Sequence, residues 1–551
     1  MSHTPTGPTG YRIVSRRAVL FEFADLESVV TAQAAVSATP VPGQVELVAA
    51  ARTLLLEVDA AEKLAPAIKD IMAREVVLRE AAEGKLVTVE AVYDGEDIAD
   101  VARIAGLTED PSAARDAVIK AHTEIEWTAA FGGFAPGFAY MTSPDERLAM
   151  PRLDSPRTKV PAGSVALADG FSAVYPKASP GGWRLIGRTK ARLWDVTKDT
   201  PALIQPGDRV QFKAVREQVS LPALRLPNFI RSANHLEVRD PGIFATMQDL
   251  GRRGHANIGV TRSGAADRTA LRRANGLVGN DEGAACIEFI GGTFRLAART
   301  DQVVAVTGAV VDIEITTPEG GTRHAVTEAP LRLQQGDRLH VGAPESGLRS
   351  YLAVRGGFDV KPIVGSRSTD TLSGVGPEQL AEGTRLAVLP PNPKSFVGQA
   401  GEPLHGLPVA GGEAVELRVV LGPRNDWFTE ESIAEFFRAE YEVTQKSSRV
   451  GVRFSGPALE RSREGELASE GTVAGALQIP KDGSPVLFLQ DHPVTGGYPV
   501  LGTVIDDDLW LAGQLPPGST VRFTPVSSGV GAAVAEASAQ PTGPAGADEL
   551  E

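Results

Sequence analysis

The sequence has a single cysteine, few aromatic residues and no excess of basic residues, and each shortage excludes a class of protein. Cys286 alone cannot form a disulfide within the chain or supply a cluster of thiolate ligands, which agrees with a reducing compartment. Lysine and arginine number 55 against 69 aspartates and glutamates, and the net charge of −14 argues against broad nucleic-acid binding. No apolar run approaches the ~20 residues of a membrane helix. The run 18–21 ends at Glu22, too short for a signal peptide. We therefore expect a cytoplasmic protein that binds neither membranes nor nucleic acid.

Several familiar catalytic motifs are also missing. The chain has no G-x-x-x-x-G-K-[ST] phosphate loop, no strand-borne G-x-G-x-x-G and no G-x-S-x-G nucleophile elbow. Its eight histidines are scattered, with no H-x-x-x-H spacing, so we expect no metal site. An active site in this chain must therefore be assembled from distant segments.

Length, glycine and proline are what the chain has in quantity. Its 551 residues exceed the ~250–300 that one hydrophobic core supports, so several domains are expected. The 58 glycines and 39 prolines indicate frequent turns between short elements, which favours β-structure. We predict a mainly β protein with an N-terminal α/β lobe.

The lobe is predicted from changes in hydrophobic period near the N-terminus. Residues 11–23 alternate like a strand, 26–38 have helical spacing, and 53–58 form an apolar strand. A helical stretch over 61–82 and a strand over 86–92 follow. These elements predict a small α/β unit.

A turn that leads into an alternating strand recurs along the rest of the chain. The copies are QPGDRVQF at 205–212, QGDRLHV at 335–341, PGSTVRF at 517–523 and, more faintly, EGTRL at 382–386. One copy is uninformative, but several at the ends of β-rich segments predict repeated, related barrels.

Linker composition completes the division of the chain. Residues 221–234 and 390–412 are rich in proline, glycine or polar residues, and the tail lacks periodicity. The predicted units are an α/β lobe over 1–95, barrels over 96–222, 235–395 and 413–526, and a disordered tail over 527–551.

The densest cluster of cations and glycines lies between residues 150 and 189. Arg152, Arg157 and Lys159 precede Gly163 and Ser164. Arginine forks and glycine-rich backbone suit a carboxylate or phosphate, so Arg152, Arg157, Lys159 and Ser164 are candidate binding residues. The alternative is a pair of barrel turns carrying solvated cations.

The second half of the chain offers candidates on predicted loops. Asp249 and Arg252 lie in TMQDLGRRG, and Asp267 ends SGAAD. Asp491 and His492 follow the apolar strand 486–489, where a strand-end loop can present an acid/base pair. We predict Asp249, Asp491 and His492 as catalytic residues and Arg252 and Asp267 as binding residues. The alternative for Asp491 and His492 is a Gly-Gly turn with a surface histidine.

Taken together, these motifs resemble two known families in order. FGGFAPGFAYM with the block 151–189 resembles the allophanate hydrolase subunit 1 family, which is the B subunit of bacterial 5-oxoprolinase. QDLGRRGHANIGVTRSGAADRTALRRANGLVGN, SSRVGVRFSGPAL and LFLQDHPVTGGYPVLGTVIDDDLWLAGQLPPG resemble the subunit 2 family, which is the C subunit of the same enzyme. The chain is thus similar to a fused B–C protein of the urea amidolyase and biotin-dependent carboxyltransferase superfamily.

The resemblance implies a fold and a reaction. The fold would consist of cyclophilin-like β-barrels in tandem after the α/β lobe. In the 5-oxoprolinase system these components work with a separate A subunit to open 5-oxo-L-proline to L-glutamate with ATP, together with Mg²⁺. Phosphorylation of the lactam oxygen would make C–N cleavage favourable, and cations are needed for the phosphates and the substrate carboxylate.

Two other functions are compatible with the same modules. A biotin-dependent carboxyltransferase component, as in urea carboxylase, would receive biotin in trans, because Ala67-Ile68-Lys69-Asp70 does not match the A-M-K-M biotin site. A regulatory binding protein of a histidine kinase is the third, although a fused chain would tether the inhibitor to its antagonist. The lack of carboxylase and carrier domains in this sequence favours 5-oxoprolinase. A homo-oligomer is consistent with each hypothesis.

Overall fold

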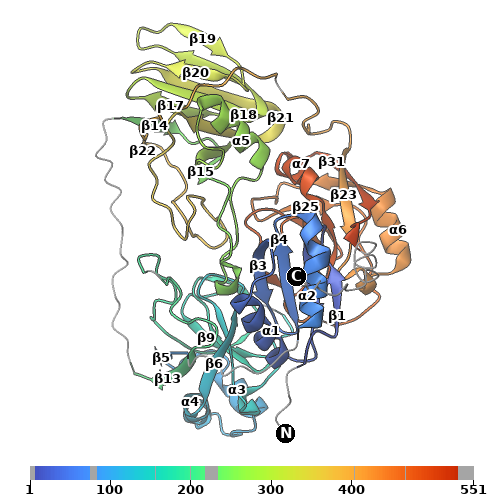
Figure 1. The fold of residues 1–551 in the computed structure, drawn as a ribbon. Coiled ribbons are helices and arrows are strands. Elements are labelled where there is room, and N and C mark those ends of the chain that lie inside the picture. Colours follow the sequence, from blue (N-terminus) through green and yellow to red (C-terminus); the bar gives the residue numbers. More distant parts are fainter. Residues whose placement is uncertain are drawn as a thin grey trace, which may run out of the picture.

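The computed structural model describes residues 6–74, 84–155, 157–198, 200–216, 234–402, 404–465 and 467–530. These residues form an N-terminal α/β lobe (blue in Figure 1), a first barrel (cyan), a central β domain (green to yellow) and a C-terminal barrel (orange to red). Most elements are strands, so the predicted fold class is confirmed.

The N-terminal lobe is a four-stranded antiparallel sheet with two helices. Its strands β1 (Gly10–Ile13), β2 (Ala18–Glu22), β3 (Gln44–Ala49) and β4 (Thr53–Val58) lie in the order β1-β2-β4-β3. Helix α1 (Leu26–Ala38) begins at Asp25, whose side chain accepts the Ser28 N–H, and α2 (Leu64–Ala73) follows a 3₁₀ turn, η1 (Ala61–Lys63). The predicted helix and the strand 53–58 are confirmed.

Two predictions for the lobe need correction, and one strand was missed. The strand predicted over 11–23 is a hairpin, because the chain turns between Ile13 and Ala18. Strand β3 was not predicted, since a short apolar run has no distinctive period. The helix predicted over 61–82 starts as a 3₁₀ turn and its second part ends at Ala73; residues 75–82 lie outside the described residues.

Both faces of the lobe's sheet are buried. Leu54 and Leu56 of β4 join a core with α1, α2 and aromatic residues of the first barrel, including Phe131. Leu55, on the opposite face, joins a core with Phe488 of the C-terminal barrel. Because side chains alternate along a strand, Glu57 lies on the same face as Leu55, toward the C-terminal barrel.

The first barrel contains seven strands, with helices α3 (Ile98–Ile104) and α4 (Ala114–Glu124) between its first two strands. The strands are β5 (Leu86–Ala91), β6 (Glu126–Gly132), β7 (Ala139–Thr142), β9 (Ser164–Ala168), β10 (Phe171–Val174), β12 (Arg184–Arg188) and β13 (Arg209–Ala214). A two-stranded ribbon, β8 (Arg157–Val160) with β11 (Ser179–Gly181), lies outside this sheet. A bridge between Val92 and Arg188, with both N–H···O bonds at 2.8 Å, connects the sheet's two ends.

The predicted boundary at residue 95 is wrong. Strand β5 pairs in parallel with β13 along its whole length, from Leu86–Arg209 to Ala91–Ala214. It therefore belongs to the first barrel, and the lobe ends before Leu86.

The C-terminal barrel is closed and repeats the topology of the first. Its strands are β23 (Val415–Leu421), β24 (Glu440–Val443), β25 (Gly451–Ser455), β27 (Ala476–Gln478), β28 (Val486–Phe488), β30 (Val500–Val504) and β31 (Thr520–Val526). Numbered within each barrel, both follow the order first, seventh, second, third, fifth, fourth, sixth, with the seventh parallel to the first. Helix α6 (Glu430–Arg438), helix α7 (Leu509–Gly513) and a short ribbon of β26 (Glu470–Gly471) and β29 (Thr495–Gly496) complete this unit.

The central domain is a nine-stranded sheet with helix α5 (Arg268–Val278) packed against it. Its strands are β14 (His235–Asp240), β15 (Phe244–Gln248), β16 (Cys286–Ile290), β17 (Phe294–Ala298), β18 (Gln302–Thr316), β19 (Thr322–Ala325), β20 (Pro330–Leu333), β21 (Arg338–Val354) and β22 (Arg385–Ala387). The long antiparallel pair β18–β21 runs through the middle of this sheet. The described residues of 390–412 form no helix or strand, and they bond to this domain through Gly398 and Gly401.

The recurring turn has one geometry at all four places. Gly207, Gly336, Gly383 and Gly518 have φ between 82° and 94°, and each precedes a strand. A left-handed residue is needed there, which favours glycine. In two copies an aspartate completes the turn: Asp208 accepts the Gln205 N–H at 2.8 Å and Asp337 accepts the Gln334 N–H at 2.9 Å.

Most of the predicted linker 221–234 and nearly all of the predicted tail 527–551 lie outside the described residues.

The turn aspartate should contribute measurably to stability. We expect Asp208→Ala to lower the free energy of unfolding by about 1–2 kcal/mol, because it leaves the partly buried backbone N–H of Gln205 without its acceptor. Calorimetric melting of both proteins measures the loss. The exposed Asp507→Ala is the control, and an equal effect from both would contradict this role.

Candidate functional site

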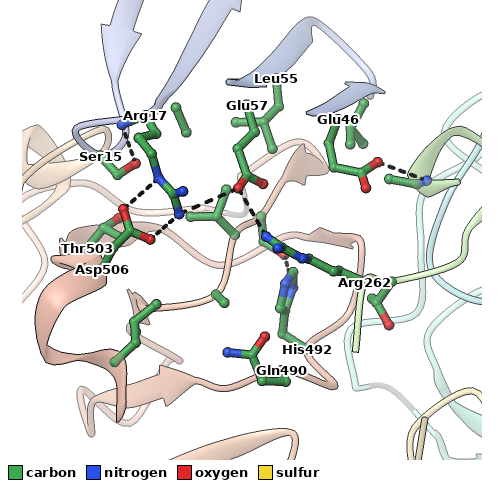
Figure 2. Close-up of a pocket in the computed structure, with 18 of the residues that line it drawn as sticks. Ser15, Arg17, Glu46, Leu55, Glu57, Arg262, Gln490, His492, Thr503 and Asp506 are labelled. Carbon is green, nitrogen blue, oxygen red and sulfur yellow. Dashed lines mark hydrogen bonds and ion pairs between the residues drawn. The ribbon is translucent and has the colours of Figure 1, made fainter. Parts of the chain in front are cut away.

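A cavity of about 60 Å³ lies where the N-terminal lobe, the central domain and the C-terminal barrel meet (Figure 2). The lobe contributes Ser15, Arg17, Glu46 and Glu57; the loop before α5 contributes Arg262, and α5 contributes Arg268; the C-terminal barrel contributes Gln490, His492 and Asp506. We call it the arginine cavity. Both halves of the chain build it.

A chain of ion pairs runs along one wall of the arginine cavity. Arg17 donates from Nε to Asp506 at 2.7 Å, and its Nη2 lies 4.0 Å from Glu57. Glu57 also lies 3.8 Å from Nη1 of Arg262, so this carboxylate sits between two guanidinium groups (Figure 2).

Arg262 and Arg268 are partly buried, and the side chain of Arg262 is 13% exposed. Arg268 donates to Oε1 of Gln490 at 2.7 Å. Burial lowers the pKa of Arg268 to about 9 and that of Arg262 to about 10, with neighbouring arginines adding to the shift. The Nε–H groups of both are buried and have no hydrogen-bond partner among the described residues. The cavity thus carries two unsatisfied guanidinium donors, and the buried hydroxyl of Thr503 on its lining also has no partner among the described residues.

Glu46 connects the lobe to the loop that borders the cavity. It is 8% exposed and accepts the N–H groups of Gly254 at 2.7 Å and Ala256 at 3.3 Å. Burial raises its pKa to about 7, the neighbouring Glu57 adds to this, and the two N–H donors oppose it. Glu46 therefore changes charge near neutral pH.

His492 faces the arginine cavity from the C-terminal barrel. Its Nδ1 lies 2.8 Å from the carbonyl oxygen of Pro493 and 3.1 Å from Oγ1 of Thr472. Because a carbonyl can only accept, the proton resides on Nδ1 and Nε2 carries the lone pair. Burial lowers the pKa of His492 to about 4, so the ring is neutral at pH 7. A neutral buried imidazole can accept a proton, and its predicted acid/base role stays a prediction.

Asp491 has different surroundings from its neighbour. It is fully buried and does not line the cavity. It accepts hydrogen bonds from Ser263 at 2.6 Å and from the backbone of Thr371 and Nε of Arg449, both at 2.9 Å. Burial alone would raise the pKa of Asp491, but Arg449 and the other donors lower it. This geometry supports a structural ion pair and not the predicted catalytic role.

Asp249 and Arg252 also lie outside the cavity lining. Asp249 accepts from the hydroxyls of Ser366 and Ser368 and from the backbone N–H of Arg367, each at 2.6 Å. Arg252 is 2% exposed and donates to the carbonyl of Ser368. The two side chains hold the loop after β15 against residues 366–368, which gives no support to their predicted catalytic and binding roles.

Asp267 positions the site without entering it. Its carboxylate caps α5 by accepting the Ala270 N–H at 2.9 Å, and its other oxygen accepts from Gln514 at 2.9 Å. Because Arg268 is the first residue of that helix, the cap fixes the backbone position from which the side chain of Arg268 extends. The geometry supports a positioning role in place of the predicted ligand-binding one.

The candidates from the first half do not converge on one anion site. Arg157 pairs with Asp97 at 2.8 Å, Ser164 donates to the carbonyl of Pro161 at 2.8 Å, and Lys159 is exposed on the outlying strand β8. Arg152 pairs with Asp169 at 2.6 Å. These residues are close in sequence, but the side chains of Arg152, Arg157 and Ser164 bond to different partners.

Arg152 does border a second hollow. This open space of about 520 Å³ lies between the first barrel, with Arg152, Asp154 and Asp169, and the C-terminal barrel, with Leu467, Ala468 and Lys481. The segment FGGFAPGFAYM, residues 131–141, contacts the C-terminal barrel, because the Phe134 N–H donates to Thr495 at 3.1 Å.

Sequence reasoning missed most of the arginine cavity. Arg262 and Arg268 flank the SGAAD motif, in which the acid Asp267 is the more conspicuous residue. Glu57 had a clearer signal, since it is the one charged residue of the apolar strand Thr53–Val58. Within the described residues, no three or more His, Cys, Asp or Glu side chains are grouped as metal ligands, and no helix is long and apolar enough to span a membrane.

Comparison with known proteins identifies the two halves. The family described as carboxyltransferase domain, subdomain C and D, matches residues 9–204, and carboxyltransferase domain, subdomain A and B, matches residues 258–525. The chain is 34% identical over 296 residues to the C subunit of 5-oxoprolinase from Escherichia coli K12, covering 53% of this chain and 91% of the relative. This chain belongs to the carboxyltransferase-domain family.

Other known proteins are similar to parts of this chain or to nearly all of it. The B subunit of 5-oxoprolinase from Escherichia coli O157:H7 is 41% identical over 140 residues, covering 25% of this chain and 62% of the relative. Urea amidolyase of Lachancea kluyveri is 33% identical over 313 residues, covering 53% of this chain but 17% of that protein. A solved structure of the protein TTHA0988 is 32% identical, with a TM-score of 0.79, and covers 92% of this chain and 99% of that one. The predicted fusion of B-like and C-like halves is confirmed.

Removing the buried charge of Asp491 should destabilise the protein. We expect Asp491→Asn to lower the free energy of unfolding by about 3–5 kcal/mol, because Arg449 would lose a buried counter-charge. Calorimetry of this variant beside exposed Asp507→Asn measures the difference. A stable Asp491→Asn protein that has lost activity would instead restore the catalytic interpretation.

Glu46 should make stability depend on pH. The pKa of Glu46 in the folded protein, about 7, lies above the ordinary value of 4.5. Protonated Glu46 therefore contributes its full share to the free energy of unfolding below pH 4.5, and this contribution is lost as the pH rises through 7. Relative to Glu46→Gln, we expect the wild type to lose at most about 3 kcal/mol between pH 4.5 and 8. Urea denaturation of both proteins across this range measures it, and parallel pH profiles would contradict the prediction.

Proposed function

We propose that this chain is the fused B–C component of an ATP-dependent 5-oxoprolinase. Together with a separate A subunit it opens the lactam 5-oxo-L-proline to L-glutamate. The observation that carries the proposal is that the arginine cavity takes Arg17 and Glu57 from the B-like half and Arg262 and Arg268 from the C-like half. A site assembled from both halves accounts for their fusion in one chain.

The chemistry of the reaction suits such a cavity. The substrate is a carboxylate, and ATP can activate it by transferring its terminal phosphoryl group to the lactam oxygen. Water then adds to the lactam carbon and the C–N bond breaks, giving an acyl phosphate, and a second water hydrolyses this to glutamate and phosphate. Anionic species occur at every stage, and buried arginines stabilise them more strongly than hydrated ones.

His492 is the residue we assign to proton transfer. The lone pair on Nε2 of its neutral ring can accept a proton from the attacking water. The Mg²⁺ of a Mg–ATP complex would arrive bound to the nucleotide phosphates. The proposal also includes a partner, the A subunit of 5-oxoprolinase, and a location, the cytoplasm.

A biotin-dependent carboxyltransferase component is the second candidate. The family descriptions of both halves name a carboxyltransferase domain, and urea amidolyase is among the relatives. Biotin would be delivered in trans by a separate carrier and would supply the carboxyl group to the acceptor.

The deciding assay measures ATP hydrolysis stimulated by 5-oxo-L-proline. The chain is tested with and without the co-expressed A subunit of 5-oxoprolinase, and both ADP and glutamate are quantified. We expect substrate-dependent ADP formation when the two proteins are present together. No activity in any combination would favour the carboxyltransferase and call for carboxyl transfer from a biotinylated partner.

His492→Gln tests the assigned role within that assay. We expect glutamate formation to fall by about 10²-fold or more, since general base catalysis contributes roughly this factor. Melting temperature controls for the loss of the bonds to Thr472 and Pro493. Full activity in a folded variant would exclude His492 as the base.

A further inference from the structure

Two buried N–H donors without partners lie on the lining of the arginine cavity. They belong to Nε of Arg262 and of Arg268, both of which line it, and they lack acceptors among the described residues. An unmet buried donor destabilises the protein, so an acceptor that fills the cavity recovers this energy.

The charges that line the cavity also favour an anion. Three guanidinium groups, of Arg17, Arg262 and Arg268, face the carboxylates of Glu57 and Asp506, while His492 is neutral at pH 7. Glu46 is the remaining titratable lining residue. When it is protonated, the lining carries one more positive than negative charge.

Size restricts the ligand further. A volume of about 60 Å³ is on the scale of one carboxylate or phosphate group.

We propose that the arginine cavity binds a single oxyanion group, a carboxylate or a phosphate, whose oxygens accept from Nε of Arg262 and Nε of Arg268. This deepens the proposed function and rests on it for the identity of the ligand, since substrate and phosphoryl product both carry such a group. Binding is nevertheless measured on this chain alone and does not require turnover.

Isothermal titration calorimetry of the full chain tests the site. Inorganic phosphate, 5-oxo-L-proline and the uncharged lactam 2-pyrrolidinone are titrated separately. We expect binding of at least one of the two anions and none of 2-pyrrolidinone. A response to 5-oxo-L-proline alone identifies a carboxylate site, and a response to phosphate alone identifies a phosphate site. Absence of binding by both anions, or equal binding of 2-pyrrolidinone, would overturn the proposal.

Arginine variants test the location. We expect Arg262→Gln and Arg268→Gln to weaken anion binding about tenfold or more, while Arg438→Gln on the exposed face of α6 leaves it unchanged. Should either glutamine variant fail to fold, Arg262→Lys and Arg268→Lys keep the charge but lose the Nε–H, and the same weakening is expected. Unchanged affinity in the folded variants would exclude this cavity.

The pH dependence provides a check that is independent of the arginines. Glu46 faces Glu57 and Arg262 in the cavity and the N–H groups of Gly254 and Ala256. Because its ionisation removes the excess positive charge, we expect affinity to fall about threefold or more between pH 6 and 8. Glu46→Gln should abolish most of that fall, after allowance for the ionisation of phosphate itself. A fall of the same size in the variant would contradict the role of Glu46.

The two proposals fail separately. If the oxoprolinase assay fails while an anion still binds, the proposed function is wrong and the site remains. The reverse result, turnover without anion binding in the arginine cavity, separates catalysis from this site and overturns the inference alone.

Discussion

The C-like half depends on the buried guanidinium of Arg449. Its side chain is 2% exposed and contacts Glu288 of the central domain, Asp491 of the C-terminal barrel and the carbonyl of Gly264 at 2.6 Å. Burial alone would lower the pKa of Arg449, but the two carboxylates raise it, so the charge is retained. Gly264 lies between Arg262 and Arg268 in the chain. The ion cluster therefore determines where both cavity arginines are held, and removing any member leaves an uncompensated buried charge.

The other half of the cavity depends on a sheet that is buried on both faces. One face of the lobe packs on its helices and the first barrel, and the other on the C-terminal barrel. Strands β3 and β4 each place one glutamate, Glu46 and Glu57, on the second face. Since the surrounding positions are apolar, these carboxylates have few partners besides Arg17, Arg262 and the backbone of the loop 254–256. The two barrels, which share one strand order, pack on opposite faces of the lobe's sheet.

Much of the fold could be predicted from the sequence because it is encoded locally. The helix Leu26–Ala38 has its Asp25 cap, the strand Thr53–Val58 is a continuous apolar run, and the recurring glycine turn requires a left-handed residue. The predictions failed where pairing joins distant segments. Strand β5 looked like the end of the lobe, yet its hydrogen bonds go to β13, more than a hundred residues later.

Of the nine candidate site residues chosen by residue chemistry, His492 lines the arginine cavity, and the family motifs identified the two halves and their order. Only the tertiary structure separated residues that line a cavity from residues that hold it in place. Asp491 and His492 are neighbours in sequence, but the first is paired with Arg449 and the second faces the arginine cavity. The physical reason is that the charge and hydrogen bonding of a buried group depend on its spatial partners, and here those partners come from segments far apart in the chain.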